Sequence, residues 1–216
     1  KSKCAITHGL EQCTLYNNNI IFAGVRENFI YLTNAYKGDS ISKVSAKSPI
    51  ILSNTKDNNL YYLENDGRGN YELKMLESLE DQTVSNPRIV KTLKGPRGAA
   101  EICVAVKNGN EIILGGKNGN IYKIDADPSI TSSNITQITD NTYSKIYDIC
   151  ASNSDFYFLT KNAIFKSSYD TGVVDKLAST NNQTNILQVS DDEVVLYSAY
   201  TKNPVVLKNL KSGEEK

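Results

Sequence analysis

A pattern of short strand-like runs recurs five times along the chain, at intervals of about forty residues. It is clearest at residues 100–125, where two identical KNGN tetrapeptides, residues 107–110 and 117–120, separate three apolar runs. An Asn-Gly pair between alternating apolar runs favours a hairpin with a type I′ turn, because both central residues of that turn need a positive φ. Each repeat is therefore predicted to contain antiparallel hairpins.

A lysine follows an apolar or aromatic residue in the third run of most repeats. Leu32 takes this place in the first repeat, and the other four carry Lys74, Lys123, Lys166 and Lys208. Side chains alternate between the two faces of a strand. The residue before each lysine is therefore predicted to point into the packing between sheets, and the lysine itself to point out.

Four strands in a repeat of this length are typical of a β-propeller blade. Fourth strands are predicted at residues 41–44, 89–93, 135–139 and 173–177, whereas the fifth repeat is predicted to end after its third strand. A further strand candidate, residues 3–7, begins the chain, and we expect it to supply the outer strand of the last blade.

The predicted fold is thus all-β: a five-bladed β-propeller of four-stranded antiparallel blades, with the last blade closed by the N-terminal strand. Residues 1–216 are expected to form one propeller domain, a length that is sufficient to bury a core. The alternative is that the chain is part of a larger propeller.

Two runs, DFYFLTKNAIFKSSYDTGVVDKLAS and EIILGGKNGNIYKID, resemble blades of the WD-repeat and TolB-like β-propeller superfamily. The first is also similar to the tyrosine-rich repeats of bacterial propellers. The resemblance extends over the whole chain, although the Trp-Asp and Gly-His dipeptides of WD repeats are missing and the chain has no Trp. It implies a rigid disc that binds something, usually a protein, on one face, and it carries over no functional residue.

Composition argues against several classes of function. Lys and Arg number 24, the same as Asp and Glu, so no excess of charge indicates a nucleic-acid partner. No apolar run is long enough to cross a bilayer, and membrane insertion is not expected. The cysteine spacings match no zinc pattern, His8 is the sole histidine, and no glycine-rich loop opens a helix, so neither a metal nor a cofactor is expected. The cysteines favour an intracellular location and leave secretion open.

An acid stands two residues before three of the four cysteines, at Glu11, Glu101 and Asp148. Because inner strands begin at the mouth of a propeller funnel, these carboxylates could converge there and support glycoside hydrolysis or hold a cation. The alternative is that they cap strand starts and pair with lysines. The chain lacks Trp for sugar stacking and lacks elaborate loops, so we do not expect an enzyme.

Loops of a propeller are divided between two faces. The connections between blades share one face with the turns between second and third strands, and there basic residues outnumber acids, whereas acids predominate on the other face. Three of the four arginines belong to the basic face. The predicted partner-binding residues are Arg26, Arg68, Arg97, Lys117, Lys161, Lys202, Tyr143 and Tyr200.

We therefore expect a non-catalytic binding module whose Arg-bearing face recognises an acidic surface or peptide of a protein partner. The alternative is a lectin-like propeller that binds carbohydrate, with sugars stacked on and hydrogen-bonded to loop residues such as Tyr143, Asn162, Asn182 and Tyr200. A glycosidase-like enzyme with funnel carboxylates ranks third.

Overall fold

The computed structural model describes most of the chain. The described residues are 13–16, 21–26, 28–34, 41–53, 59–66, 68–76, 87–94, 102–127, 129–130, 133–139, 143–152, 154–170, 172–190, 192–198 and 205–216. All regular structure within these ranges is β-strand, so they contain no helix that could cross a membrane. The chain divides into two compact bodies. Body 1 comprises Lys1–Gly98 and Asp125–Ile135, and body 2 comprises Ala99–Ile124 and Thr136–Lys216.

Body 1 contains the first two repeats, each as four antiparallel strands in sequence order. The first repeat is β1 (Cys13–Tyr16), β2 (Ile21–Arg26), β3 (Phe29–Asn34) and β4 (Ile41–Ser45). The second is β5 (Ile50–Ser53), β6 (Leu60–Asn65), β7 (Asn70–Leu76) and β8 (Arg88–Lys94). A two-residue strand, β12 (Ser133–Asn134), pairs in parallel with the end of β8.

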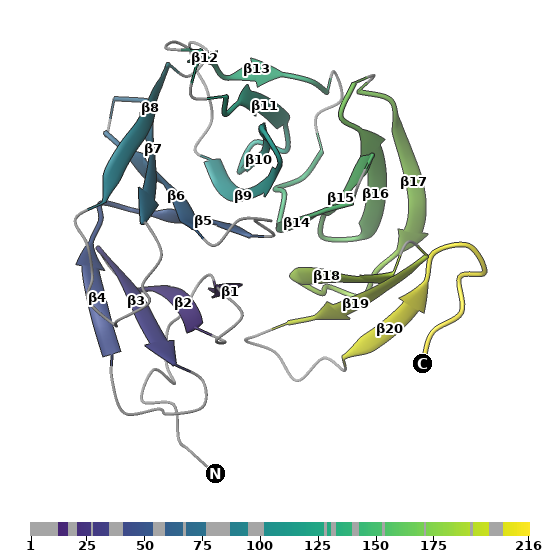
Figure 1. Ribbon diagram of the computed structural model, residues 1–216. Coiled ribbons are helices and arrows are strands. Elements are labelled where there is room, and N and C mark those ends of the chain that lie inside the picture. The colour runs from purple at the N-terminus through teal and green to yellow at the C-terminus, as the bar shows by residue number, and fades with distance from the viewer. Residues whose placement is uncertain are drawn as a thin grey trace. The chain divides into compact units, whose positions relative to one another are not determined.

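Body 2 contains the other three repeats (Figure 1). The third repeat is β9 (Ile102–Asn108), β10 (Glu111–Gly116), β11 (Ile121–Asp125, whose last residue belongs to body 1) and β13 (Thr136–Gln137). The fourth is β14 (Asp148–Ala151), β15 (Asp155–Leu159), β16 (Ala163–Ser168) and β17 (Val174–Ser179). The fifth is β18 (Asn185–Ser190), β19 (Glu193–Tyr197) and β20 (Val206–Asn209).

Three of the predicted fourth strands, at residues 41–44, 89–93 and 173–177, are confirmed as β4, β8 and β17. The strand predicted at 135–139 is instead divided into β12 and β13, which pair with β8 and β11 respectively. Ile135 separates the two, and its backbone N–H donates to the carbonyl of Lys94 at 3.2 Å. The segment is divided because its two ends pair with the edges of different strands.

The fifth repeat has three strands in its sheet, β18 to β20, as the sequence predicted, but a further segment pairs with β20. The chain turns back after β20, and Leu207 and Lys216 exchange both backbone hydrogen bonds, at 3.0 and 2.9 Å. The Asn209 N–H donates to the Glu214 carbonyl at 2.9 Å. Residues 214–216 therefore occupy the edge of β20 that had been assigned to residues 3–7, which lie outside the described part of the chain.

Both KNGN segments form hairpin turns, as predicted, but the type I′ geometry is wrong. Asn108 pairs with Glu111, which leaves Gly109 and Asn110 as the loop, and of these two only Gly109 has a positive φ, of 60°. That is the pattern of a type II′ turn. In the second segment Gly119 has a φ of 83° and its N–H donates to the Gly116 carbonyl, which gives a three-residue loop. The turns differ from type I′ because the strand register does not put the first asparagine of each segment at the first central position of a two-residue loop.

Successive repeats pack face to face within each body. In body 1 the first repeat contributes Ile30 and Val44 to a buried cluster that also contains Leu60 and Tyr62 of the second repeat. In body 2 one cluster joins the third and fourth repeats, and another joins the fourth and fifth. Sheets covered on both faces explain why strands such as β10 and β15 are apolar at consecutive positions.

This packing corrects the prediction for the repeat lysines. Leu73 and Tyr122 are buried as expected, but the lysines that follow them do not point freely into water. Lys208 is buried, and Lys74, Lys123 and Lys166 are partly buried, each with a carboxylate against its ammonium group. Alternation gives the side of the sheet on which each side chain lies, but the neighbouring sheet decides whether that side is exposed.

Candidate functional site

Tyr143 joins two turns of body 2 that carry predicted binding residues. Its backbone N–H donates to the Gly119 carbonyl at 3.3 Å, which ties it to the β10–β11 turn. Its ring packs on Phe158 and Phe165, with centroids 5.3 and 4.8 Å away, close to the β15–β16 turn. Tyr143 therefore holds these two turns next to each other.

Three lysines surround this aromatic anchor. Lys117 lies in the β10–β11 turn and Lys161 in the β15–β16 turn, and both are exposed. Lys145, in the connection between the third and fourth repeats, is also exposed, and its ammonium group lies 5.1 Å from the centre of the Tyr147 ring. We call Lys117, Lys145 and Lys161 the lysine cluster. Sequence reasoning missed Lys145 because it took that residue as part of the following strand.

The neighbouring connection between the fourth and fifth repeats is bound to the same turns. Thr180 donates its backbone N–H to the Asn162 carbonyl at 3.0 Å and its hydroxyl to the Lys161 carbonyl at 3.3 Å. Asn162 and Asn182, proposed as sugar-binding residues of a lectin, are both exposed here. The described residues of these loops, 117–120, 143–147, 160–162 and 180–184, include no acid. Lysines are therefore the charged residues that these described ranges contribute.

The corresponding loops of body 1 carry Lys47 and Arg68, and both are exposed. Arg68 lies in a turn organised by Asp66, whose Oδ1 accepts the N–H groups of Arg68 and Asn70 at 2.6 and 3.1 Å. The hydrogen bond from the Asn70 side chain is the main cause that lowers the pKa of Asp66, so its negative charge stays beside Arg68. This turn is therefore less basic than Arg68 alone suggested.

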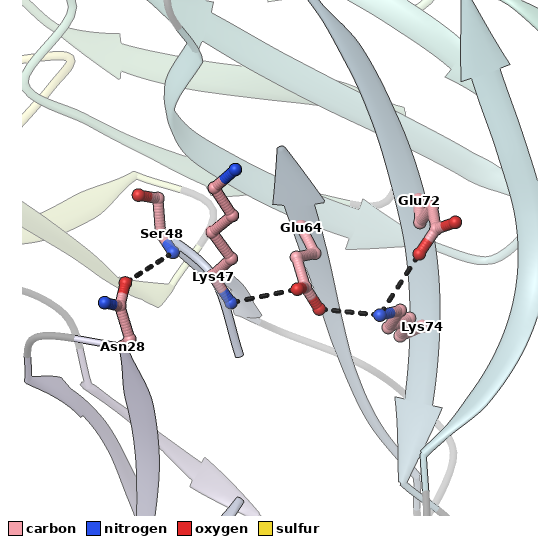
Figure 2. Close-up of polar contacts among 6 residues, drawn as sticks. All are labelled: Asn28, Lys47, Ser48, Glu64, Glu72 and Lys74. Atoms are coloured by element: carbon pink, nitrogen blue, oxygen red, sulfur yellow. Dashed lines mark hydrogen bonds and ion pairs between the residues drawn. The ribbon is translucent and has the colours of Figure 1, made fainter. Parts of the chain in front are cut away.

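A network of hydrogen bonds and ion pairs lies beside the connection from β4 to β5 (Figure 2). The Glu64 carboxylate accepts the Lys47 backbone N–H at 3.0 Å and the Lys74 ammonium at 2.7 Å, and Lys74 also contacts Glu72 at 3.1 Å. Ser48, with a φ of 45°, donates its N–H to Asn28 at 3.4 Å. Burial opposes the charge on Lys74, but its bonds to the two glutamates raise its pKa overall. Glu64 therefore holds the connection through the Lys47 backbone N–H, and both acids contact the Lys74 ammonium group.

Asp148 is held by backbone and side-chain donors at the start of β14. Its two carboxylate oxygens accept the N–H groups of Ile149 at 2.9 Å and of Ile186 in β18 at 3.0 Å, and Asn185 donates a further hydrogen bond. Burial raises the pKa of Asp148 to about 6, although these hydrogen bonds act in the opposite direction. The carboxylate joins the fourth and fifth repeats, so its geometry matches a structural cap better than a funnel acid.

Two of the predicted funnel carboxylates, Glu11 and Glu101, lie outside the described residues, and so do Arg97, Lys202 and Tyr200. Arg26 ends β2 and pairs with Phe29 across the hairpin, which fixes its backbone position. Within the described ranges no group of three or more His, Cys, Asp or Glu side chains is arranged to hold a metal ion. Cys103 donates its thiol to the Ile146 carbonyl at 3.2 Å, and Cys150 packs in a core cluster.

Several acids of the opposite set of turns are neutralised by lysines. Asp155 contacts Lys166 at 3.0 Å, Asp192 contacts Lys211 at 2.7 Å, and Glu111 contacts Lys123. Counting loop residues alone therefore overstates the negative charge of these turns, because Lys123 and Lys166 lie in strands.

Comparison with solved structures defines the class of this protein. It is similar to a chain of the mitotic checkpoint complex, with a TM-score of 0.60 and 16% identity over 95% of this chain and 64% of that one. It is also similar to the WD40 β-propeller domain of Doa1, at 0.62 and 12% over 96% and 67%. A protein assigned as TolB from Agrobacterium tumefaciens gives 0.63 and 16% over 96% and 79%.

These similarities show the fold: the protein is an all-β propeller of the WD40 and TolB-like kind, as the repeat pattern predicted. The sequence matches no family model and no curated protein. The chain spans 64% of the length of the checkpoint-complex chain. The strand groups described above are hereafter called blades.

Proposed function

We propose that this propeller is a non-catalytic binding module whose basic face recognises an acidic surface or peptide of a protein partner. The observation that carries the proposal is the lysine cluster, three exposed cations in the connection and the turns that Tyr143 joins. The WD40 β-propeller domain of Doa1 and a chain of the mitotic checkpoint complex share the fold, which agrees with a binding role.

The lysine cluster carries more of the proposed recognition than the arginines do. Lys47 and Arg68 extend the basic surface of body 1, but Asp66 lies within the Arg68 turn. Exposed charge pairs contribute only about 0.2–1 kcal/mol each, so affinity must come from several contacts and from steering by the summed field. Three exposed lysines in neighbouring loops can supply several such contacts.

The alternatives are less well supported by the contacts. A lectin would need Tyr143 as a stacking platform, yet this ring packs on Phe158 and Phe165. A glycosidase would need Asp148 to transfer a proton or attack a sugar, yet both of its oxygens accept backbone N–H groups. We therefore keep carbohydrate binding as an outcome of the test below and propose that the protein is not an enzyme.

Charge reversal of the lysine cluster should abolish binding of an acidic peptide. We expect the double variant Lys117→Glu, Lys161→Glu to bind a fluorescein-labelled hexaglutamate peptide at least tenfold more weakly than the unmodified chain, because repulsion replaces attraction. Fluorescence anisotropy at several salt concentrations measures the affinity, which should fall as salt increases.

The matched control is Lys43→Glu, Lys176→Glu, which makes the same charge change at exposed strand positions. Equal weakening by both double variants would show a general charge effect and contradict the site. An affinity that changes neither with the lysine-cluster substitutions nor with salt would contradict electrostatic recognition. Binding on a glycan array would then support the lectin.

We further propose that the five repeats close into a ring of five blades in one domain, residues 1–216. The support is the outer face of the fifth blade, where Leu187, Val189 and Val205 are 57%, 56% and 68% exposed. Propeller blades bury such faces against a neighbour, and closure would use the first blade for this purpose. The last blade is closed by residues 214–216 in this proposal, because these residues and 3–7 cannot share one edge of β20.

If the ring closes in this way, the free energy of unfolding of the double variant Leu187→Asp, Val189→Asp should be lower by about 3 kcal/mol or more, since two charges would be buried. Thermal and urea unfolding measure it, with Val173→Asp, 62% exposed, as the control. An unchanged melting curve would rule out closure over this face. Deleting residues 1–8 tests the N-terminal strand separately, and a large loss of stability there would return the closing role to residues 3–7.

A further inference from the structure

The outer edge of β20 is paired with an exposed segment. Residues 214–216 pair with Leu207–Asn209 through backbone hydrogen bonds of 2.9–3.0 Å, and residues 211–216 are all exposed. An exposed pairing of this kind opens at a small free-energy cost, because few buried contacts are lost.

Lys208 gives this edge a preference for a segment that carries a carboxylate. Its side chain is 8% exposed, and its ammonium group contacts Glu215 at 2.6 Å and the Ser179 carbonyl of β17 at 3.2 Å. In the second, third and fourth blades the equivalent lysine finds a carboxylate on its own second strand: Glu64 in β6, Glu111 in β10 and Asp155 in β15. In the fifth blade the carboxylate comes instead from the exposed segment.

The reason lies in the second strand of that blade. Lys208 is opposite Val194 in β19, and Asp192, two residues earlier, contacts Lys211 at 2.7 Å. Lys208 therefore depends on residues 214–216 for its anion. A buried ammonium group that loses its carboxylate is costly, so any strand that replaces this segment must bring one.

We propose that the edge of β20 is a second docking site, which accepts an extended acidic segment of a partner protein by strand addition and which residues 214–216 cover in the isolated chain. Strand addition supplies backbone hydrogen bonds as affinity and side-chain positions as specificity. The Ser179 carbonyl holds the Lys208 ammonium in place before the partner arrives, which reduces the entropy cost of binding.

The register defines the partner sequence. In an antiparallel segment a Glu or Asp must lie opposite Lys208, as Glu215 does. Three positions later, the residue would lie opposite Val205, on the face of the sheet that also carries Leu187 and Val189 and that ring closure would bury, so an apolar side chain suits this position. The proposed motif is therefore acid-x-x-apolar in an extended conformation.

The test uses the full chain with Glu215→Lys, which repels the segment from Lys208 and uncovers the edge. We expect a fluorescein-labelled peptide, GEEKTV, to bind this variant at least tenfold more tightly than the unmodified chain, as measured by anisotropy. The peptide GEQKTV, which lacks the carboxylate opposite Lys208, should bind at least tenfold more weakly than GEEKTV. A folded Glu215→Lys variant that binds neither peptide more tightly than the unmodified chain would overturn the proposal.

A second measurement does not depend on the folding of that variant. Millimolar GEEKTV added to the ¹⁵N-labelled unmodified chain should move the amide resonances of Glu215 and Lys216 towards unfolded positions, because the peptide displaces them. No movement at saturating peptide would equally overturn the proposal. Binding of GEEKTV should persist in the Lys117→Glu, Lys161→Glu variant, so failure of this site and failure of the basic face are distinguishable.

Discussion

Replacing Gly119 by alanine should lower the free energy of unfolding by more than about 4 kcal/mol, a loss that few single substitutions cause. Gly119 has a φ of 83°, and a Cβ there would overlap the carbonyl oxygen of Tyr143. Neither the turn nor the Tyr143 backbone can move easily, because the Tyr143 ring packs on Phe158 and Phe165. Urea unfolding followed by circular dichroism measures the change.

The matched control is Gly109→Ala in the identical KNGN tetrapeptide. Gly109 has a φ of 60°, and a Cβ there would meet nothing within 4 Å. The cost should be the backbone strain alone, about 1–2 kcal/mol. If both variants lost the same stability, the close approach of the β10–β11 turn to Tyr143 would be wrong, and with it the arrangement of Lys117 and Lys161 around this residue.

Acidification from pH 7.5 to about 5 should stabilise the Asp148 site. Burial raises the pKa of the folded protein's Asp148 to about 6, above its value in the unfolded chain. The folded state therefore binds more protons than the unfolded state between these two pKa values. The free energy of unfolding contributed by this group must fall as pH rises through that window and stay low above it. The upper limit is about 3 kcal/mol, from the size of the shift.

Other carboxylates also titrate in this range, so the measurement compares two proteins. Asp148→Asn cannot ionise, and its remaining carbonyl oxygen still accepts one of the N–H groups of Ile149 and Ile186. We expect the stability of the original chain relative to Asp148→Asn to increase as pH is lowered to 5. A difference that is independent of pH would show that Asp148 is not desolvated at the β14–β18 junction.

Strand positions were largely predictable because they depend on local signals. Period-two apolar runs and Asn-Gly pairs located β9, β10 and β11 and their turns, and the repeat extended this assignment to the other blades. The turn geometry was not predictable, because it depends on which residues pair. Asn108 is the last paired residue of β9, and a shift of one position would have made it the first loop residue.

The pairing of residues 214–216 with β20 escaped sequence reasoning for a different reason. Residues 211–216, KSGEEK, have no strand propensity, and their pairing is supported by the contact between Glu215 and Lys208 and by the turn at Gly213. The sequence alone does not indicate this contact, because its importance depends on the burial of Lys208. The division of loops between two faces predicted Lys117, Lys161 and Tyr143 as binding residues, which stays a prediction, and it did not indicate that the Tyr143 ring packs on Phe158 and Phe165.

The internal ion pairs of the blades bear on how such a chain can arise by duplication. The second, third and fourth blades each contain both the repeat lysine and an acid that neutralises it, at Glu64, Glu111 and Asp155. When a blade of this type is copied or deleted, no lysine in a neighbouring blade loses its carboxylate. The genetic event therefore leaves no buried charge without its counter-charge. The fifth blade lacks this independence, because Lys208 relies on Glu215 beyond its third strand. Copies of the fifth blade that omit this segment would be selected against, whereas internal blades can be multiplied without compensating changes elsewhere.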